Sequence, residues 1–394
     1  ELAVGRLSAT TAYSDWDLAP YSNTLAFAPG FELVSGVRQR QRTWTEEIKL
    51  AAPAASSLRW QAGIFGSSGR TDGAFDRFFG PFPYERSVYR TDAKDLAAYG
   101  EATAKLSDAL QFTAGLRLES ARREMLRRET VPAVQTFDLD HRASALLPKL
   151  GLSYTVAPGT AVFATAGAGF KPGGFSAFTG NRALAAFGPE RTKTLEAGLT
   201  RADPSGRYTA TLRGFWYDIT GYQIERSFAT SAVADDYLVV NAPRARSVGG
   251  EFEFAWRPVA GLTLAADLGV TRVTLREFTD PYTGVSYAGK RAPFVPSYDA
   301  SLRADYRAAA GWFVGAELSR NGRTPYSEDN SAFFAQDAVS LLSARLGYDA
   351  RRWRVTVYGR NLTDDDYNSA ITPGTGHGTP GAPRTIGAEV AVKF

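Results

Sequence analysis

Cysteine is absent from this 394-residue sequence, and Met and His are scarce, with one and two copies. The absence of Cys excludes a disulfide framework, thiolate chemistry and a zinc-finger site. No run of about 18 apolar residues occurs, which excludes a transmembrane helix. A strong excess of one charge is also lacking, because 45 basic and 41 acidic residues leave a net charge of +4. No cationic stripe with interleaved aromatics indicates nucleic-acid binding.

Glycine and aromatic residues are abundant, with 38 Gly, 24 Phe, 18 Tyr and 7 Trp. Because Gly costs roughly 1 kcal/mol in a helix interior, this composition favours strands and tight turns. Apolar and polar residues alternate with a period of two in residues 110–119, 251–257, 262–270, 353–360 and 385–394. Such alternation predicts strands with one apolar and one polar face.

Short turns and long stretches follow one another along the chain. The turn residues recur at 107–109, 157–159, 203–206, 258–260, 308–310 and 349–351. The long stretches, which we expect to be irregular loops, cover 14–39, 67–93, 120–143, 170–190, 223–240, 277–296, 321–337 and 364–383. This pattern is typical of transmembrane β-barrels and predicts about sixteen strands.

The polar faces carry charged residues such as Arg117, Glu253 and Asp267, each of which would cost several kcal/mol in a dry core. A wet lumen accommodates them, whereas the apolar faces need lipid, which only a closed barrel tolerates among strand structures. The sequence therefore predicts an all-β fold, a transmembrane antiparallel β-barrel; a large soluble β-protein is the alternative. Aromatics near strand ends suit interfacial girdles: Tyr154, Tyr306, Trp312, Tyr348, Trp353 and Phe394.

Several segments carry recognisable motifs in a fixed order. They are Gly-Phe-Lys-x-Gly-Gly-Phe with Lys171, Gly173 and Gly174, the strand start at 189–199, the strand pair with Asn241, Gly250 and Glu251, the Asn361-Leu362 signature, and the closing strand that ends at Phe394. Together they resemble the β-barrel of TonB-dependent outer-membrane receptors, over essentially all of residues 1–394.

This resemblance implies the outer membrane of a Gram-negative bacterium and uptake of a scarce nutrient. A ferric siderophore is the expected ligand, and cobalamin or a carbohydrate stays open. The family's plug and TonB box have no counterpart here, and about sixteen strands are fewer than the usual twenty-two or so. We therefore expect a barrel part whose contact with TonB runs only through a missing N-terminal region. A passive porin-like or surface-binding barrel is the alternative.

The sequence begins at Glu1 inside a strand pattern and shows no signal peptide. We therefore expect a truncated chain, in which residues 2–13 form no regular ladder with residues 383–394 and leave an open seam. The final strand descends after the loop that contains His377, so the C-terminus and the short turns share one side. We expect that side to be periplasmic and the long loops to be extracellular.

Nothing in the sequence indicates catalysis, and no cofactor or metal site is expected. His141 and His377 lie far apart and have no metal-ligand spacing. The glycines at 167–174 lack the helix and acidic partner of a dinucleotide fingerprint. Asp364, Asp365 and Asp366 do not fit an EF-hand loop.

Aromatic residues in the long stretches are the candidate ligand contacts, since aromatic clusters in loops indicate recognition surfaces. Together with one histidine, the candidates are Phe78, Phe79, Tyr84, Phe175, Phe178, Phe333, Phe334 and His377. Packing of one loop on another is the alternative explanation. Arg122, Arg123, Arg127 and Arg128 form a basic run in one predicted loop, which suits an anionic ligand or the phosphates of lipopolysaccharide.

Overall fold

The computed structural model describes residues 4–28, 31–53, 56–230, 233–281, 283–372 and 378–393. Among these residues no helix is long and apolar enough to cross a membrane. The chain forms two compact units. The first comprises Glu1–Gly151, Ala166–Lys193 and Ile219–Arg244, and the second Leu152–Thr165, Thr194–Asp218 and Ala245–Phe394. We describe each unit separately.

Sixteen antiparallel strands are hydrogen-bonded in sequence order, which confirms the predicted all-β fold and strand number. They are β1 (Arg6–Ala28), β2 (Phe31–Ala51), β3 (Leu58–Phe79), β4 (Phe82–Lys105), β5 (Leu110–Val131), β6 (Gln135–Ala157), β7 (Thr160–Lys171), β10 (Glu190–Ala202), β11 (Tyr208–Thr230), β12 (Val233–Trp256), β13 (Leu262–Glu277), β14 (Tyr298–Arg307), β15 (Trp312–Asn321), β18 (Val339–Asp349), β19 (Trp353–Arg360) and β22 (Thr385–Val392).

Three further pairs of short strands lie outside this sheet. They are β8 (Gly174–Phe175) with β9 (Ala186–Phe187), β16 (Thr324–Pro325) with β17 (Ala335–Gln336), and β20 (Asn368–Ile371) with β21 (Gly378–Pro380). The only helix among the described residues is the 3₁₀ turn η1 (Arg182–Leu184). The order of the main sheet has β1 and β22 at its two ends. That residues 2–13 form no ladder with residues 383–394 stays a prediction.

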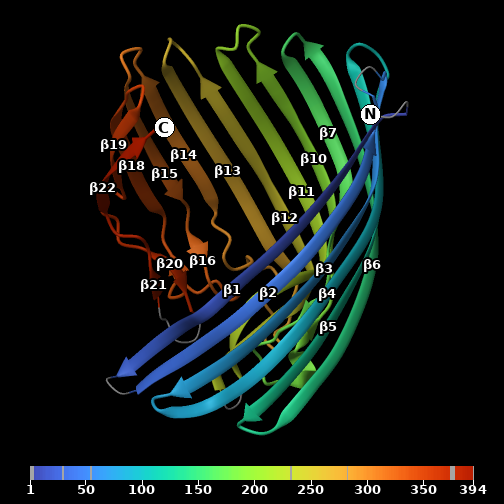
Figure 1. The fold of residues 1–394 in the computed structure, drawn as a ribbon, viewed down its shortest axis with the longest axis vertical. Helices are drawn as coiled ribbons and strands as arrows, with labels where there is room; N and C mark the ends of the chain where they lie inside the picture. The colour runs from blue at the N-terminus through green and yellow to red at the C-terminus, as the bar shows by residue number, and fades with distance from the viewer. Residues whose placement is uncertain are drawn as a thin grey trace. The chain divides into compact units, whose positions relative to one another are not determined.

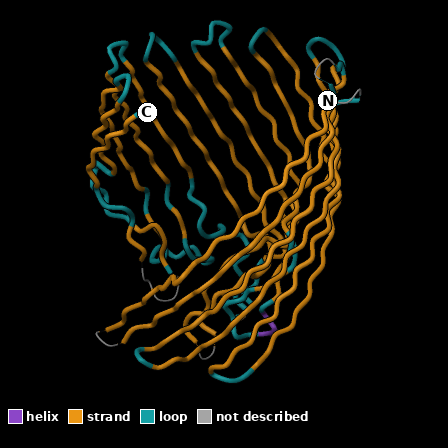
Figure 2. Tube along the Cα trace, viewed as in Figure 1, coloured by secondary structure: helices purple, strands orange, loops and turns teal. Residues whose placement is uncertain are grey.

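Long regular hairpins dominate the first unit, where β1–β5 lie side by side (Figure 1). The expectation of irregular loops at 14–39, 67–93, 120–143 and 223–240 is wrong. Apart from the turns at 80–81 and 132–134, the described residues of these stretches belong to strands, and Figure 2 shows β3 and β4 running to a short turn at their tip. The ladder of β3 and β4 extends from Leu58↔Ala104 to Phe79↔Phe82. Antiparallel pairing satisfies the backbone groups along this ladder apart from one bulge between Arg77 and Phe78.

The two faces of these hairpins differ. We call one the covered face, because residues 172–187 pack on it, and the other the open face. On the open face, rows of charged residues run across the strands, as in Arg40↔Asp72 and Asp72↔Arg90. Opposite charges join neighbouring strands, with 2.8 Å between Arg70 Nε and Asp92 Oδ1. Cross-strand pairs of this kind support a sheet modestly.

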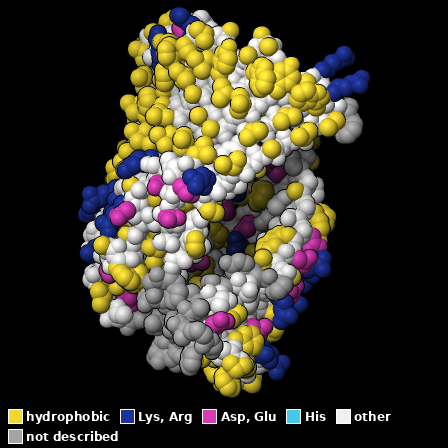
Figure 3. Space-filling model, turned by 90° about the vertical axis from the view of Figure 1, so that its left-hand side faces the viewer, with side chains coloured by type: hydrophobic (Ala, Val, Ile, Leu, Met, Phe, Trp, Pro, Cys, Tyr) yellow, Lys and Arg dark blue, Asp and Glu magenta, His cyan; other side chains and the backbone are white. Residues whose placement is uncertain are grey.

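In the second unit, β13–β15, β18, β19 and β22 form hairpins with short turns at 308–311 and 350–352. Their other ends lead into longer connections that contain the short strand pairs. Figure 3 shows a band of apolar side chains over β18, β19 and β22, with charged side chains beyond it. Its exposed members include Leu346, Trp353, Val357, Ile386 and Val390. An apolar band on strands is the surface that faces lipid in a membrane barrel.

Aromatic residues lie at the short-turn ends of these strands, as predicted from the sequence. Trp312 pairs with Tyr348 across the ladder, with ring centroids 5.1 Å apart, and Tyr348 lies 5.5 Å from Trp353. Trp312, Trp353 and Tyr306 are exposed. An exposed aromatic row at a strand end is typical of an interfacial girdle. Phe394 lies outside the described residues.

Asp349 lies at the β18–β19 turn among three cations. It accepts hydrogen bonds from Arg354 Nη2 at 2.6 Å, Lys393 Nζ at 2.7 Å and Arg307 Nη1 at 3.1 Å. These bonds, with that from Arg354 first, hold the pKa of the Asp349 carboxyl well below its usual range. A lowered folded-state pKa contributes stability above the unfolded value, and this contribution is lost as the pH falls through the folded value.

We therefore expect Asp349→Asn to lower the unfolding temperature at neutral pH. The difference from the wild type should narrow progressively below about pH 4, near the ordinary pKa of Asp. Heat-induced unfolding of the detergent-solubilised protein, followed by its electrophoretic mobility, measures both. Asp108→Asn, in the exposed 107–109 turn, is the control and should change nothing. A difference that persists undiminished at pH 2 would contradict the expectation.

Candidate functional site

Residues 172–187 fold back onto the covered face of the first unit. They contain the β8–β9 pair, in which Gly174 and Phe175 pair with Phe187 and Ala186. Asn181 begins η1, and its side chain accepts a hydrogen bond from the Ala183 backbone N–H at 3.1 Å. A small apolar core anchors the segment through three buried residues, Met125, Phe137 and Ala185. We call residues 172–187 the inward segment.

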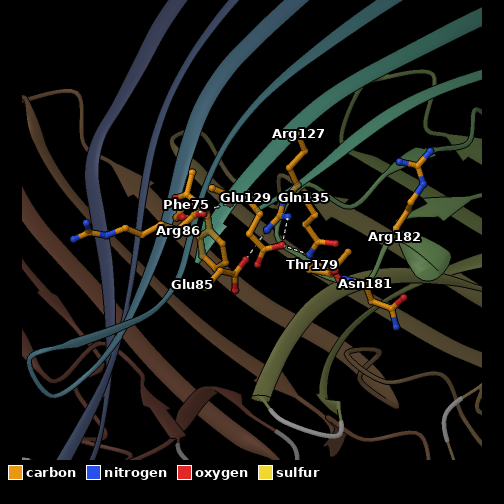
Figure 4. A network of polar contacts seen from close by, with 12 residues as sticks. Phe75, Glu85, Arg86, Arg127, Glu129, Gln135, Thr179, Asn181 and Arg182 are labelled. Carbon is orange, nitrogen blue, oxygen red and sulfur yellow. Dashed lines mark hydrogen bonds and ion pairs between the residues drawn. The ribbon is translucent and has the colours of Figure 1, made fainter. Parts of the chain in front are cut away.

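Four ionised side chains are buried beneath the inward segment: Arg77, Glu85, Arg127 and Glu129. We call them the buried charge network. Arg127 is its centre, with Nη2 2.7 Å from Glu85 Oε1 and Nη1 3.1 Å from Glu129 Oε2. Figure 4 shows these three side chains converging, while Arg86 points away from them. Two guanidinium groups and two carboxylates balance in charge, which is a condition for burying them.

The network ties the inward segment to the strands. Arg127 Nε donates to the Ala177 carbonyl oxygen at 3.0 Å. Gln135 Nε2 donates both to Glu129 and to the Gly180 carbonyl oxygen, the latter at 3.1 Å. Hydrogen bonds to ionised groups are stronger than those between neutral groups. The inward segment is therefore held by charge-assisted bonds as well as by apolar packing.

Arg77 makes fewer polar contacts than Arg127, the other arginine of the network. Its side chain has no exposed surface, and Nη1 lies 3.3 Å from Glu85 Oε2. Its guanidinium carbon lies 4.8 Å from the Phe75 ring centroid and 5.5 Å from that of Tyr237. None of its three nitrogens makes a hydrogen bond within the described part of the chain. Its burial rests on one ion pair and two cation–π contacts.

Aromatic residues complete the covered face around the network. Phe178 of the inward segment packs on Phe75, with centroids 4.8 Å apart, and on Tyr89 at 5.8 Å. The Tyr89 hydroxyl donates to Gln39 Oε1 at 3.2 Å. Burial raises the pKa of Tyr89 to about 12, so the phenol stays protonated and a donor at neutral pH.

The glycines of the Gly-Phe-Lys motif allow close approach of two backbones. A Cβ on Gly173 would lie 2.4 Å from the Phe187 carbonyl oxygen and 2.7 Å from His141 Nε2. Gly174 is also buried, and Lys171 is exposed at the end of β7. The motif therefore serves the turn into the inward segment. His141 lies against that turn and takes no part in a metal cluster among the described residues.

Asn241 of β12 fixes the other end of the inward segment. Its Oδ1 accepts from the Gly188 backbone N–H at 2.6 Å, and its Nδ2 donates to the carbonyl oxygens of Gly188 at 3.0 Å and Gly221 at 2.7 Å. Gln223 adds bonds from Nε2 to the Pro172 and Gly188 carbonyl oxygens. Two side-chain amides thus clamp the residues that flank the segment.

The candidate ligand contacts of the first unit fall into two groups. Phe79 is exposed at the tip of the β3–β4 hairpin and Phe78 lies beside it, beneath the Arg86 guanidinium at 5.4 Å. Tyr84 occupies the bulge between the pairs Arg77↔Glu85 and Phe78↔Pro83. Phe175 and Phe178 instead pack against the covered face. Phe82 joins the tip as its most exposed aromatic, at 72 %.

In the second unit, Phe333 is 74 % exposed and stacks edge-on against Phe334, with centroids 5.0 Å apart. The other sequence candidates have structural partners. Glu251 pairs with Arg213, and a Cβ on Gly250 would lie 3.3 Å from the Arg213 carbonyl oxygen. His377 lies outside the described residues.

The Asn361-Leu362 signature shapes the loop that follows β19. Asn361 has a positive φ of 47°, and its Nδ2 donates to the carbonyl oxygens of Asp365 and Ala382, both at 3.1 Å. The Leu362 backbone N–H donates to the Leu342 carbonyl oxygen at 2.8 Å. Asn tolerates this backbone region better than most residues, so the signature has a local structural role.

The four arginines that were predicted to form a basic loop do not lie in a loop. Arg122, Arg123, Arg127 and Arg128 lie within strand β5, so the run is divided between the two faces. Arg122 pairs with Asp140 on the open face at 3.1 Å. Arg123 pairs with Asp95 at 2.8 Å, and Arg127 enters the buried charge network. Strand geometry, in which successive side chains point to opposite faces, separates residues that are adjacent in sequence.

The sequence did not single out Arg77, Glu85 or Glu129. Arg127 and Glu129 are spaced by two, which is the strand signal that the sequence carries there, whereas Arg77 and Glu85 lie eight residues apart and carry no such signal. Within the described residues, no group of three or more His, Asp or Glu side chains could hold a metal ion.

Comparison with known proteins agrees with this architecture. The family model described as "TonB dependent receptor-like, beta-barrel" matches residues 2–362. The chain is 25 % identical to the pesticin receptor of Yersinia pestis over 369 residues, which is 90 % of this chain and 51 % of that protein. It is 28 % identical to the metal-pseudopaline receptor CntO of Pseudomonas aeruginosa over 263 residues, 64 % of this chain and 34 % of that one.

Among solved structures, the ferric yersiniabactin uptake receptor FyuA of Yersinia pestis has a TM-score of 0.84 at 21 % identity, covering all of this chain and 60 % of that one. The siderophore receptor PiuA of Acinetobacter baumannii has a TM-score of 0.79 at 14 % identity, covering 99 % and 62 %. The chain thus spans about half the length of the pesticin receptor. The whole-chain match favours a receptor barrel over the passive porin-like alternative.

Proposed function

Because the chain belongs to the TonB-dependent receptor family, as its β-barrel, we propose that it is the barrel of a receptor that imports a metal chelate, a ferric siderophore first. Proteins of this family are non-enzymatic and lie in the Gram-negative outer membrane, as this chain does. Energy coupling through TonB, by way of a plug outside residues 1–394, is part of the proposal. The short turns face the periplasm and the long hairpins the exterior.

The observation that carries the proposal is the exposure of Phe79 and Phe82 at the tip of the β3–β4 hairpin. Exposed aromatic pairs are costly in water and serve as contact area for a partly apolar ligand. The hairpin ladder holds them at a defined position. The names of the metal-pseudopaline receptor and of the ferric yersiniabactin uptake receptor support a chelate as cargo, and the metal then arrives inside its ligand.

In this function the exposed tips make the first contact, and the ligand then passes along the covered face. The inward segment occupies part of that face, because the buried charge network and the Asn241 clamp hold the segment against the strands. Pre-organised aromatic contacts cost little ordering on binding. The barrel therefore supplies capture and positioning, and no bond is made or broken.

Replacing both Phe79 and Phe82 by Ala should weaken binding of the cognate ferric siderophore about tenfold or more, since an aromatic contact is worth about 1 kcal/mol. Quenching of intrinsic fluorescence by a panel of ferric siderophores, a copper chelate and cobalamin, added to the full-length receptor in detergent, measures affinity and identifies the ligand class. Leu106→Ala removes an exposed apolar side chain at the opposite end of β4 and is the matched control.

The proposal fails if cobalamin binds while none of the ferric siderophores and not the copper chelate does. The role of the tip fails separately, if a siderophore binds equally to the wild type and to the double variant. Heat-modifiable migration on gels verifies that the double variant folds, as expected for the last pair of the ladder, whose side chains are exposed.

A further inference from the structure

The short turns of the second unit form one continuous edge, which has no role in the proposed function. They lie side by side at one end of the strands (Figure 1). Backbone N–H groups of one turn donate to carbonyl oxygens of the next at 2.7–2.9 Å, in the pairs Arg257–Arg207, Arg307–Gly261, Asp349–Gly311 and Lys393–Arg352. We call residues 203–207, 257–261, 307–311, 349–354 and 391–393 the short-turn rim.

The short-turn rim is strongly basic. Its seven cations and two acids give a net charge of +5, which exceeds the +4 of the whole chain. Both acids are paired, Asp203 with one rim cation and Asp349 with three. Arg257, Arg351 and Arg352 are exposed, and none of the three makes an ion pair within the part of the chain that the structure describes. The rim therefore has free positive charge to offer a partner.

Several rim cations point away from the lipid. Three exposed aromatic residues at the short-turn ends are each followed directly by an arginine, in the pairs Trp256–Arg257, Tyr306–Arg307 and Trp353–Arg354. Successive side chains of a strand point to opposite faces. Because the aromatic residues belong to the lipid-facing girdle, the arginines beside them lie on the other face. Lipid headgroups therefore do not account for the rim, and its partner comes from the aqueous side.

The spacing of the cations indicates the form of the partner. Neighbouring strands lie about 4.8 Å apart, so the turns follow one another every 10 Å or so, about two strand spacings. Uncharged residues separate the cations, as in 258–261 and 308–311. Such a row matches a chain with repeated anionic groups better than one small anion. Arginine presents a planar fork that pairs with a carboxylate through two hydrogen bonds.

We propose that the short-turn rim binds peptidoglycan, the periplasmic polymer whose peptides carry carboxylates, through Arg257, Arg351 and Arg352. The inference rests on the proposed function for its orientation, in which the short turns face the periplasm. The rim and the polymer then lie on the same side of the membrane. The bonds between turns hold the rim backbone in place, so binding orders little beyond the side chains. Peptidoglycan binding is independent of the ligand that the receptor imports.

The test is cosedimentation of the full-length receptor, in detergent, with purified peptidoglycan sacculi. We expect Arg257→Gln/Arg351→Gln/Arg352→Gln to bind about tenfold more weakly than the wild type, from the modest contributions of three exposed ion pairs. The substitutions break no ion pair of the described residues, so the variant should fold, which heat-modifiable migration verifies. Arg38→Gln/Arg128→Gln/Arg142→Gln removes the same charge from exposed arginines of the long hairpins. This control should bind like the wild type.

Two further ligands separate the possible partners. They are sacculi whose carboxyl groups have been amidated, and phosphatidylglycerol titrated into the detergent and followed by native mass spectrometry. The proposal is overturned if the wild type does not sediment with native sacculi, if the rim variant binds them like the wild type, or if amidated sacculi bind equally well. It is also overturned if the rim substitutions weaken only the binding of phosphatidylglycerol.

A single cysteine tests the orientation separately, because residues 1–394 contain none. Ala309→Cys, in the β14–β15 turn, should react with a membrane-impermeant maleimide only after the outer membrane of the cells has been permeabilised; the parent receptor is the labelling control. Labelling in intact cells overturns this inference and the proposed orientation together. Absence of sacculus binding with the expected labelling overturns this inference alone and leaves the proposed import as it stands.

Discussion

Replacing Arg127 by Met is expected to release the inward segment and to destabilise the first unit by about 3–5 kcal/mol, the usual effect of removing one partner of a buried ion pair. Met fills much of the volume but leaves Glu129 buried without its cation. It also removes the bond to the Ala177 carbonyl oxygen. Amide hydrogen exchange in residues 172–187, measured on the receptor in detergent, should rise by orders of magnitude.

Two comparisons make this result specific. Arg123→Met removes an arginine of the same strand that pairs with Asp95 in a partly exposed position, and it should leave exchange in residues 172–187 unchanged. Arg127→Met/Glu129→Gln removes the orphaned carboxylate as well and should recover part of the stability. Unchanged exchange in Arg127→Met would show that apolar packing alone holds the segment.

Gly173→Ala is expected to have the second large effect. The added methyl would meet the Phe187 carbonyl oxygen at 2.4 Å and the Gly188 carbonyl carbon at 2.8 Å. Both are backbone atoms, so the β8–β9 pair must move apart, at a cost of roughly 1–3 kcal/mol. We expect faster proteolysis between residues 172 and 187 and a lower unfolding temperature.

Gly169→Ala is the matched control for this prediction. It lies four residues earlier on β7, and its Cβ would meet nothing closer than Thr192 Cβ at 3.6 Å, an ordinary contact. It should leave proteolysis and unfolding as in the wild type. Equal behaviour of the two variants would mean that the β8–β9 turn adapts to a side chain at position 173.

The number of strands could be predicted from the sequence because the apolar band gives strong alternation, as in residues 262–270. The continuation of the strands beyond the band could not be predicted, because there both faces of a strand are polar. In residues 120–131, Arg122 and Arg128 lie on one face and Arg123 and Arg127 on the other, so the contrast on which periodicity depends disappears. Regular pairing there is a property of the backbone ladder and of cross-strand charges, which one strand's sequence does not reveal.

The sequence predicts only part of the candidate site, because the contacts that form the site join residues that are distant in the sequence. The motif positions Gly173 and Asn241 were identified, but their roles were not, because Asn241 joins Gly188 and Gly221 through tertiary contacts. The pairing of Arg77 with Glu85 depends on a bulge at Tyr84 that shifts the register by one residue. Spacing along the sequence does not encode that shift.

Because the ladders of the long hairpins are regular, the length of a hairpin can change in steps of two residues in each strand. Side chains alternate with a period of two, so deleting two residues from each strand of a hairpin keeps every remaining residue on its original face. Each such deletion shortens the hairpin by about 7 Å. In β3–β4, the height of the Phe79–Phe82 tip above the membrane can therefore change without redesign of the covered face below it. The length of such a hairpin can therefore evolve separately from the contacts on the covered face.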